Sequence, residues 1–479
     1  MSIDQVEETI AVEAGLEATV IPPKTSSPSP PAQWLPPPIA WYAVVMVSLV
    51  TLCGQLDYGL ISLLVQPIKK STHMSDVQIS LLMGWAYSLP YLLCGFPLGW
   101  LSDRARRTYV LSGALTVWSV GTALCGLTSS FWPFAASRGV MGGAISVKGP
   151  TTVSVIPDLV PRDKLARAFG VYNICLTGGQ YLSSIVGGLV LGFLLLPHHM
   201  PIHLLGIQIK EAWQMVFILM AVPGLLLAPF VALTVREPAR QGARSQPKSL
   251  MEVLRQILEV LHFMFRGPAS RIYLPTVIGT ALSGILLAGY GGWRAAFYDR
   301  SYHMAAHVYG PLSGMLGLIG APIGVLIGAF VVERMHRKWI DSHLRIAVIA
   351  HALMMPIYIF TPLLPNATLA LGLQFVMGIL LIAAAPSQLA AMQIITPSRM
   401  RAQVNAIYMI TISVIGNGAG PWVVAQMTRH LFHTESHLGL AMMTLAAICT
   451  PLSLFCLILT VKPYGRIYQK IRDAEAAQA

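Results

Sequence analysis

The sequence contains few charged residues. Asp, Glu, Lys and Arg together make up 11% of the 479 residues, whereas 55% of the residues are hydrophobic. A soluble globular protein needs about a quarter of its residues to be charged in order to cover its surface. This shortage excludes an ordinary soluble domain and predicts an all-α polytopic membrane protein that lies in a lipid bilayer.

Cysteine is also scarce, and loops between apolar segments contain none of it. All six cysteines fall within apolar segments, where they are expected to pack as small hydrophobic side chains: Cys53, Cys94, Cys125, Cys175, Cys449 and Cys456. This placement argues against both a disulfide framework and a metal site. No nucleophile–His–acid spacing is present either, so we do not expect an enzyme.

The N-terminal segment, residues 1–38, lacks the basic start and the short apolar core of a cleaved signal peptide. It carries several acids followed by a run rich in Pro and Ser. This composition predicts a disordered cytoplasmic tail. The first apolar run would then act as an uncleaved insertion signal.

Long apolar runs are abundant, and about 20 mostly apolar residues are enough to cross a bilayer. The runs at 132–157 and 344–361 give the weakest signal, because Gly, Pro and polar residues interrupt them. The sequence contains twelve candidate spans: 41–65, 77–101, 109–130, 132–157, 167–196, 213–235, 272–297, 309–332, 344–361, 367–395, 402–428 and 438–461.

Basic residues gather on one side of these spans. An even number of spans places both termini on the same side, and most of the 32 Lys and Arg residues then fall in loops on that side. Such loops are typically cytoplasmic. We therefore expect cytoplasmic termini and a location in the cell inner (plasma) membrane. The same distribution accounts for the net charge of +12 without a nucleic-acid partner.

Two pairs of similar stretches indicate an internal repeat. GWLSDRARR (99–107) and GAFVVERMHRK (328–338) each close the second long apolar run of their half. PRDKLARAFGVY (161–172) and PSRMRAQVNAIY (397–408) each lead into the fifth. Two similar halves of six helices, with a substrate path between them, form a transporter architecture.

The domain boundaries follow from this repeat. We expect two six-helix bundles at 39–235 and 272–461, joined by a cytoplasmic linker at 236–271 and followed by a cytoplasmic tail at 462–479. Within the linker, the apolar residues of 249–265 share one helical face. That pattern predicts an amphipathic helix along the inner membrane surface, with a tethering role favoured over a function of its own.

These stretches resemble the signatures of the major facilitator superfamily, over about 40–461. Within the superfamily, the first half is most similar to bacterial spinster-like members. The stretches that carry this likeness are SDVQISLLMGWAYSLPYLLCGFPLGWLSDRARR (75–107), VWSVGTALCGLTSSFW (117–132) and AGYGGWRAAF (288–297). The resemblance implies a twelve-helix fold that works by alternating access, often driven by protons.

The resemblance also implies roles for matching residues. Asp57 stands where spinster-like proteins carry a protonatable Asp in the first span, and Arg138 matches the Arg of the fourth span. Two positions depart from the pattern: Tyr58 replaces an Arg, and Ile145 replaces an acid. The implied coupling set is therefore incomplete in this chain.

A cytoplasmic gate is implied at the ends of the second and eighth spans. Asp103 and Arg104 would form a charge relay that latches the two halves together when the inner side is closed. With the repeat included, the expected gate consists of Gly99, Asp103, Arg104, Arg107, Glu333 and Arg334.

Charges within the spans need a function or a partner, because each costs a few kcal/mol to insert. Asp57 is the only acid inside any predicted span, and Arg138 lies at a similar depth. The two form either a proton or substrate switch or a permanent ion pair. Lys148 lies deeper with no acid at its level, so a position on a water-filled path that attracts anions is favoured over snorkelling. Arg294 either supports the same preference or anchors its helix at the interface.

Aromatic and amide side chains in several spans suggest a hydrated cavity. Each of them alone more often makes a hydrogen bond between helices. A few polar groups among apolar walls, however, form a typical ligand pocket. Gln374 belongs to this polar set. The expected substrate-binding residues are Arg138, Lys148, Tyr87, Tyr91, Gln180, Tyr181, Tyr290, Trp293, Gln388 and Asn417.

Together these features predict a secondary active transporter of a small organic anion, such as an amphipathic or aromatic carboxylate. Asp57 is the expected proton-coupling residue. We expect the proton gradient as energy source, no cofactor and a functional monomer. The main alternative is a proton-driven exporter of lysolipids or lipophilic compounds. A membrane-embedded enzyme and a sensor without transport activity are further alternatives.

Overall fold

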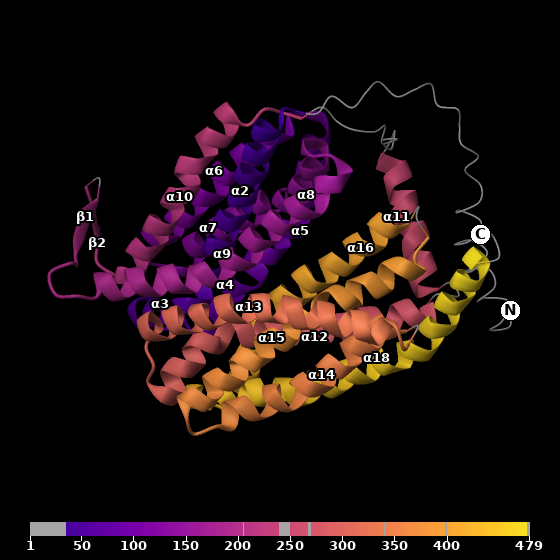
Figure 1. The fold of residues 1–479 in the computed structure, drawn as a ribbon. Helices are drawn as coiled ribbons and strands as arrows, with labels where there is room; N and C mark the ends of the chain where they lie inside the picture. Colours follow the sequence, from indigo (N-terminus) through magenta and orange to yellow (C-terminus); the bar gives the residue numbers. More distant parts are fainter. Residues whose placement is uncertain are drawn as a thin grey trace.

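The computed structural model describes residues 35–204, 206–238, 250–266, 270–339, 341–397 and 400–476. The predicted N-terminal tail lies outside these residues up to residue 34, as does the part of the predicted linker at 239–249. The described chain is almost entirely helical, as the hydrophobic composition predicts (Figure 1).

The first half of the chain forms one bundle. Its helices are α2 (Pro37–Leu63), α3 (Val65–Thr72), α4 (Asp76–Met83), α5 (Trp85–Arg104), α6 (Arg107–Leu127), α7 (Phe131–Ile145), α8 (Lys148–Leu159), the 3₁₀ turn η1 (Arg162–Lys164), α9 (Leu165–Leu194) and α10 (Ala212–Thr234). Between α9 and α10, the strands β1 (Ile202–Leu204) and β2 (Ile207–Ile209) form an antiparallel hairpin in which Ile202 pairs with Ile209.

The second half forms a similar bundle after a connecting helix. Its elements are α11 (Leu250–Phe265), α12 (Ser270–Tyr302), α13 (Ala306–His336), α14 (Ser342–Phe360), η2 (Thr361–Leu363), α15 (Ala367–Ile395), α16 (Arg401–Ile410), a π-helical segment η3 (Thr411–Gly416), α17 (Asn417–His430), η4 (Glu435–His437) and α18 (Leu438–Ala476). Helix α11 falls where the linker sequence predicts an amphipathic helix.

Helix starts follow local capping chemistry. Ser75 and Gln78 form a capping box at the start of α4, and Asn366 caps α15 by accepting a hydrogen bond from the backbone N–H of Thr368 at 2.8 Å. These polar residues stop the apolar runs, which explains why the predicted start of the span at 367–395 coincides with that of α15.

Eleven helices among the described residues are long and apolar enough to cross a membrane. They correspond to eleven of the predicted spans, including the weak one at 344–361. The remaining span, at 132–157, consists of α7 and α8, with 15 and 12 residues, which are too short to be counted separately. The chain turns between them at Ser146 and Val147. The expected twelve-helix fold is therefore confirmed, with its fourth span broken near the middle.

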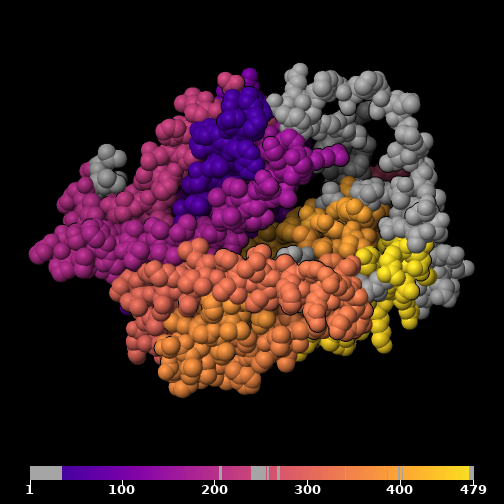
Figure 2. All heavy atoms as spheres, in the orientation of Figure 1, coloured from indigo at the N-terminus to yellow at the C-terminus, as the bar shows by residue number. Residues whose placement is uncertain are grey.

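The two halves lie side by side, and their helices meet on one side of the molecule. Helix α13 packs on α9, α12 on α2, and α17 on α4 and α5. We call the end that carries the β1–β2 hairpin the hairpin side, and the end that carries α11 and the last turns of α18 the linker side (Figure 1). The surface is hollowed between the halves on the linker side (Figure 2).

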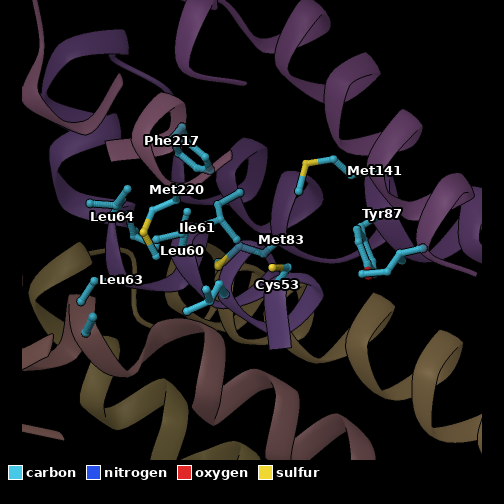
Figure 3. Packing of buried hydrophobic residues seen from close by; sticks show 14 of the residues in the cluster. Cys53, Leu60, Ile61, Leu63, Leu64, Met83, Tyr87, Met141, Phe217 and Met220 are labelled. Carbon is cyan, nitrogen blue, oxygen red and sulfur yellow. The ribbon is translucent and has the colours of Figure 1, made fainter. Parts of the chain in front are cut away.

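A continuous apolar core holds the first bundle together. Figure 3 shows part of it, where Leu60 and Ile61 of α2, with Leu64 just after this helix, face Phe217 and Met220 of α10. The outer surface is also apolar: the exposed fractions of Leu93, Leu233 and Leu326 are 71%, 84% and 70%. In water such surfaces would favour aggregation, whereas in a bilayer they contact lipid.

Candidate transport site

A cavity of about 520 Å³ lies between the two halves. Helices α2, α4, α7 and α9 line it from the first half, and α12, α13, α15 and α17 from the second. Its walls are mostly small or apolar. The polar residues that line it are Tyr58, Ser62, Arg138, Thr177, Gln180, Tyr181, Ser184, Arg294, Tyr309, Ser313, Gln374 and Asn417. This is a pocket of the size and character of a small-molecule site.

Four of the predicted substrate-binding residues line this cavity: Arg138, Gln180, Tyr181 and Asn417. They come from α7, α9 and α17, so the cavity joins predicted residues of both halves. Asn417 directly follows the π-helical segment of its span, a type of irregularity that is frequent at functional sites.

Arg138 is the most deeply buried of these side chains, with an exposed fraction of 0%. Its Nε donates to the carbonyl oxygen of Leu82 at 3.1 Å, and its guanidinium carbon lies 5.0 Å from the ring centre of Tyr87. Its two terminal nitrogens, Nη1 and Nη2, have no hydrogen-bond partner among the described residues. A buried guanidinium with unused donors is suited to binding an anion.

Asp57 lies next to this group in α2 and is 2% exposed. Arg138 and Lys148 are the two cations whose charges act on its carboxylate, and Thr122 of α6 is a polar neighbour. No ion pair joins Asp57 to either cation in the described part of the chain, and its Oδ1 has no hydrogen-bond partner there. The permanent Asp57–Arg138 ion pair, one of the two readings of the sequence, is not formed in this structure.

Lys148 begins α8, just after the break in the fourth span, and packs against α2. A Cβ at Gly54 would lie 3.0 Å from Lys148 Nζ and 3.0 Å from Ile145 Cδ1, so the ammonium group packs closely against α2 at this glycine. Gly54 precedes Asp57 by one helical turn. Lys148 is not among the cavity-lining residues, and its placement favours a role beside Asp57 over the predicted contact with substrate.

The other predicted substrate-binding residues do not line the cavity. Trp293 is fully buried and donates from Nε1 to the carbonyl of Pro421 at 2.8 Å. The Tyr290 hydroxyl donates to the carbonyl of Tyr358 at 2.9 Å. Gln388 donates to the Thr280 hydroxyl at 3.0 Å. These contacts hold helices of the second half together.

Tyr87 and Tyr91 also lie outside the lining residues. Their ring centres are 6.4 Å apart, and Tyr87 packs against Tyr58, whose ring centre is 5.2 Å away. Tyr87 therefore lies between Tyr58 on the cavity wall and Tyr91, and its ring also contacts the guanidinium of Arg138. Tyr87 thus supports a cavity residue without lining the cavity.

Sequence reasoning left several lining residues out of the site. Arg294 and Gln374 were recognised as polar groups within spans but not assigned to the site. Tyr309 gave no separate signal, because it lies in a run of small and apolar residues. In the structure, Tyr309 and Gln374 hydrogen-bond to each other at the cavity wall, with Gln374 Nε2 3.2 Å from the tyrosine hydroxyl.

Arg107, a predicted gate residue, binds within its own half. Its Nε donates to Glu237 at 2.9 Å, and its Nη1 donates to Asp158 of α8 at 2.6 Å. The backbone N–H and the hydroxyl of Thr108 also donate to Glu237, both at 3.0 Å. Burial alone would raise the pKa of Glu237, but these hydrogen bonds and the charge of Arg107 lower it overall. The network ties α6 to α8 and to the chain after α10.

The remaining predicted gate residues lie at the linker side, where the halves are apart. Glu333 pairs with Arg337 one turn away at 2.5 Å, and both are exposed. The guanidinium of Arg104 lies 4.1 Å from the ring centre of Trp100. A Cβ at Gly99 would meet nothing within 4 Å. The inter-half latch expected from Asp103 and Arg104 thus remains a prediction for a conformation that is closed on this side.

On the hairpin side, an ionic cluster joins the halves. Asp76 of α4 accepts from both terminal nitrogens of Arg300 of α12, at 2.7 and 2.8 Å. Lys69 of α3 donates to Asp76 at 2.7 Å and also pairs with Glu435 of the second half. The sequence did not single out these residues, because each lies at a helix end. We call Lys69, Asp76, Arg300 and Glu435 the hairpin-side cluster.

Comparisons with known proteins agree with this architecture. The family model described as Major Facilitator Superfamily matches residues 47–421. An MFS-type efflux pump of Mycolicibacterium smegmatis is 27% identical over 441 residues, which cover 89% of this chain and 94% of that protein. A protein described as a probable L-galactonate transporter of Escherichia coli is 24% identical over 387 residues, covering 76% of this chain and 78% of the relative.

A solved structure has the same fold. The crystal structure of a bacterial homologue of the human lysosomal transporter Spinster, inward-facing and unoccupied, superposes with a TM-score of 0.69. It is 23% identical in sequence and covers 91% of this chain and 98% of its own. The likeness to the spinster-like group is thereby confirmed. The chain belongs to the major facilitator superfamily and is a membrane transporter, not an enzyme.

Proposed function

We propose that this transporter moves a small organic anion by proton-coupled alternating access. It acts as a monomer in the cell inner membrane, with the linker side and both termini in the cytoplasm. In this assignment the structure corresponds to the inward-facing state, because the halves separate on the linker side and meet through the hairpin-side cluster.

The charge of the cavity is the observation that carries the proposal. Two guanidinium groups, Arg138 and Arg294, line it, and no carboxylate does so among the described residues. In a medium of low dielectric constant, unpaired cations repel a cationic substrate and attract an anionic one. Gln180 and Gln374 add hydrogen-bonding groups, and apolar side chains provide the rest of the wall.

Asp57 is suited to couple the anion to protons. The charges of Arg138 and Lys148 act on its carboxylate, so an ionised Asp57 offsets part of the positive charge that the anion would experience. A proton on Asp57 removes that offset and strengthens anion binding at Arg138. By reciprocity, a bound anion favours the protonated carboxylate. Proton and anion would therefore move in the same direction, as in a symporter.

The relatives support an anionic cargo in part. The Escherichia coli relative is named for L-galactonate, an organic anion. The Mycolicibacterium relative is named as an efflux pump, and apolar lining residues such as Leu287, Leu316 and Phe375 would suit a lipophilic cargo. Export of lysolipids or lipophilic compounds is therefore the second candidate function. Among the described residues no carboxylate lines the cavity, which argues against export of lipophilic cations.

The test is uptake into proteoliposomes that contain the purified full-length protein. A panel of radiolabelled organic anions, neutral analogues and organic cations of matched size is offered under identical gradients. We expect uptake of anions only, and a loss of at least about tenfold in Arg138→Gln, since hydrogen bonds to charged groups contribute about 1.5–3 kcal/mol. Arg429→Gln removes an exposed cation of α17 away from the cavity and serves as the control. Uptake of cations, or of neutral lipophilic compounds alone, would contradict the proposal.

A further inference from the structure

We propose that the substrate is a dianion, an organic molecule with two acidic groups, and that each half of the transporter holds one of them. Arg138 of α7 binds one acidic group and Arg294 of α12 binds the other. This inference rests on the proposed function and adds the substrate class and the second anchor.

Arg138 can bind an anion through hydrogen-bond donors that have no partner among the described residues. It uses Nε to bind the carbonyl of Leu82, and the ring of Tyr87 lies against its guanidinium. These contacts fix the plane of the guanidinium while Nη1 and Nη2 keep no partner in the described chain. Two parallel N–H donors in a fixed plane match the two oxygens of a carboxylate or a phosphate.

Arg294 is a second anchor in the opposite half. It is half-buried and lines the same cavity, and the side chains that act on its charge are four tyrosines: Tyr309, Tyr358, Tyr298 and Tyr181. No carboxylate lies within ion-pair distance of it among the residues that the structure describes. Neutral phenols do not compensate a guanidinium, so its charge is available to a ligand.

Other deeply placed arginines in this protein have acidic partners. Arg107 is 3% exposed at its side chain and binds Asp158 and Glu237. Arg300 lies on the same helix as Arg294, is 9% exposed and binds Asp76 through both terminal nitrogens. Arg138 and Arg294 differ from this pattern, and both line the cavity between the halves. Unpaired cations in a membrane protein are costly unless they serve a ligand.

The placement of the two arginines explains why two acidic groups are needed. Arg138 belongs to the first half and Arg294 to the second, so a monoanion neutralises only one half. A dianion neutralises both and links the halves through its own skeleton. The cavity wall also offers Gln180, Tyr309 and Gln374, which suits a polar or aromatic skeleton. Dicarboxylates and carboxylate–phosphates share this chemistry.

The experiment measures binding to the purified full-length protein by isothermal titration calorimetry. The probes are straight-chain α,ω-dicarboxylates, their monomethyl esters, and ω-phosphono carboxylates of equal length. Each dicarboxylate and its ester have the same skeleton and differ by one charge. We expect at least one dianion to bind about tenfold or more tightly than its own monoester. The length of the best dianion reports the spacing of the two anchors, and the phosphono series distinguishes a carboxylate from a phosphate as the second group.

Substitutions of the two arginines test which acidic group each of them binds. Arg294→Gln should lower the affinity for the dianion to that of the monoester and leave the affinity for the monoester unchanged. Arg294→Lys keeps the charge and should retain part of the preference. Arg138→Gln should weaken both ligands, and Arg429→Gln should weaken neither.

The outcomes separate this inference from the proposed function. If monoesters bind the unaltered protein as tightly as dianions across the series, the dianion inference is overturned while anion transport stands. If no anion of either charge binds, the proposed function fails with it. The comparison of ligands on the unaltered protein decides both points even if a variant does not fold.

Discussion

Asp76 and Arg300 form a bidentate ion pair between the two halves, with oxygen–nitrogen distances of 2.7 and 2.8 Å. Their side chains are 7% and 9% exposed, so little water competes for the contact. Asp76 begins α4 in the first half, and Arg300 lies in the last turn of α12 in the second. The pair can exist only while the hairpin side is closed, and it therefore stabilises the conformation seen here.

Replacing either member should shift the transporter toward the conformation that is open on the hairpin side. Removing one partner of a buried ion pair costs about 3–5 kcal/mol because the other charge is left uncompensated. Asp76→Asn and Arg300→Gln should each lengthen the distance between spin labels at Lys70→Cys and Ser301→Cys, measured by pulsed EPR. The double variant should be no more open than either single variant.

Glu435→Gln, at an exposed member of the cluster, should have a smaller effect. Unchanged distances in both single variants would show that the pair does not control the equilibrium.

Gly84 gives a steric test of the same closure. It lies between α4 and α5, where a Cβ would collide with the carbonyl oxygen of Gly418 and lie 2.8 Å from that of Asn417. Gly84→Ala should therefore separate α17 from α4 and open the hairpin side, with slower transport. Gly113→Ala is the matched control, because a Cβ there would meet nothing within 4 Å. A Gly84→Ala protein with normal label distances and normal transport would refute the proposed close approach.

The Arg107–Glu237 network predicts a pH-dependent contribution to stability. The folded-state pKa of Glu237 lies below its ordinary value of 4.5, so the network stabilises the fold fully above that value and loses its effect as the pH falls through the folded-state pKa. The melting temperature of the purified protein should therefore drop more between neutral pH and pH values below 4.5 than that of Glu237→Gln. The variant should already be less stable at neutral pH, by about 1–3 kcal/mol. Equal acid sensitivity of the two proteins would assign the loss to other groups.

Lys148 and Gly54 test whether the ammonium group serves Asp57 or the substrate. Because Lys148 does not line the cavity, Lys148→Ala should leave substrate affinity within about twofold and impair uptake driven by a proton gradient. Gly54→Val adds a side chain whose Cβ would lie 3.0 Å from Lys148 Nζ, so it should displace the ammonium group and reproduce the same defect. A large loss of affinity in Lys148→Ala would restore the prediction from sequence that this residue contacts the substrate.

Hydrophobic patterning was sufficient to predict the fold. The span at 367–395 matches α15 at both ends, since polar and Pro-containing segments bound a continuous apolar run. The fourth span was recognised but not its break. Hydropathy does not register that Pro150 lacks the N–H that would bond the Ser146 carbonyl, a local effect that favours separation of α7 from α8 at this point.

The site was harder to predict, because composition does not reveal how a helix is rotated about its axis. Trp293 and Arg294 are neighbours in α12, yet the indole packs under Pro421 while the guanidinium lines the cavity. Asp57 and Tyr58 are separated in the same way, with only the tyrosine on the cavity wall. In a helix that is apolar all round, no hydrophobic face marks the inside. Charged, amide and aromatic residues are accordingly found both among the four predicted residues that line the cavity and among those that do not.

The most direct test of the account is gradient-driven uptake of the bound anion by proteoliposomes with the unaltered protein and with Asp57→Asn. With the unaltered protein, an inward proton gradient should drive accumulation of the anion above its external concentration. Asp57→Asn should abolish this accumulation and retain downhill exchange of the anion, because Arg138 and Arg294 remain in place. Proton coupling through Asp57 would be contradicted if uptake by the unaltered protein did not depend on the proton gradient. Full accumulation by Asp57→Asn would contradict it as well.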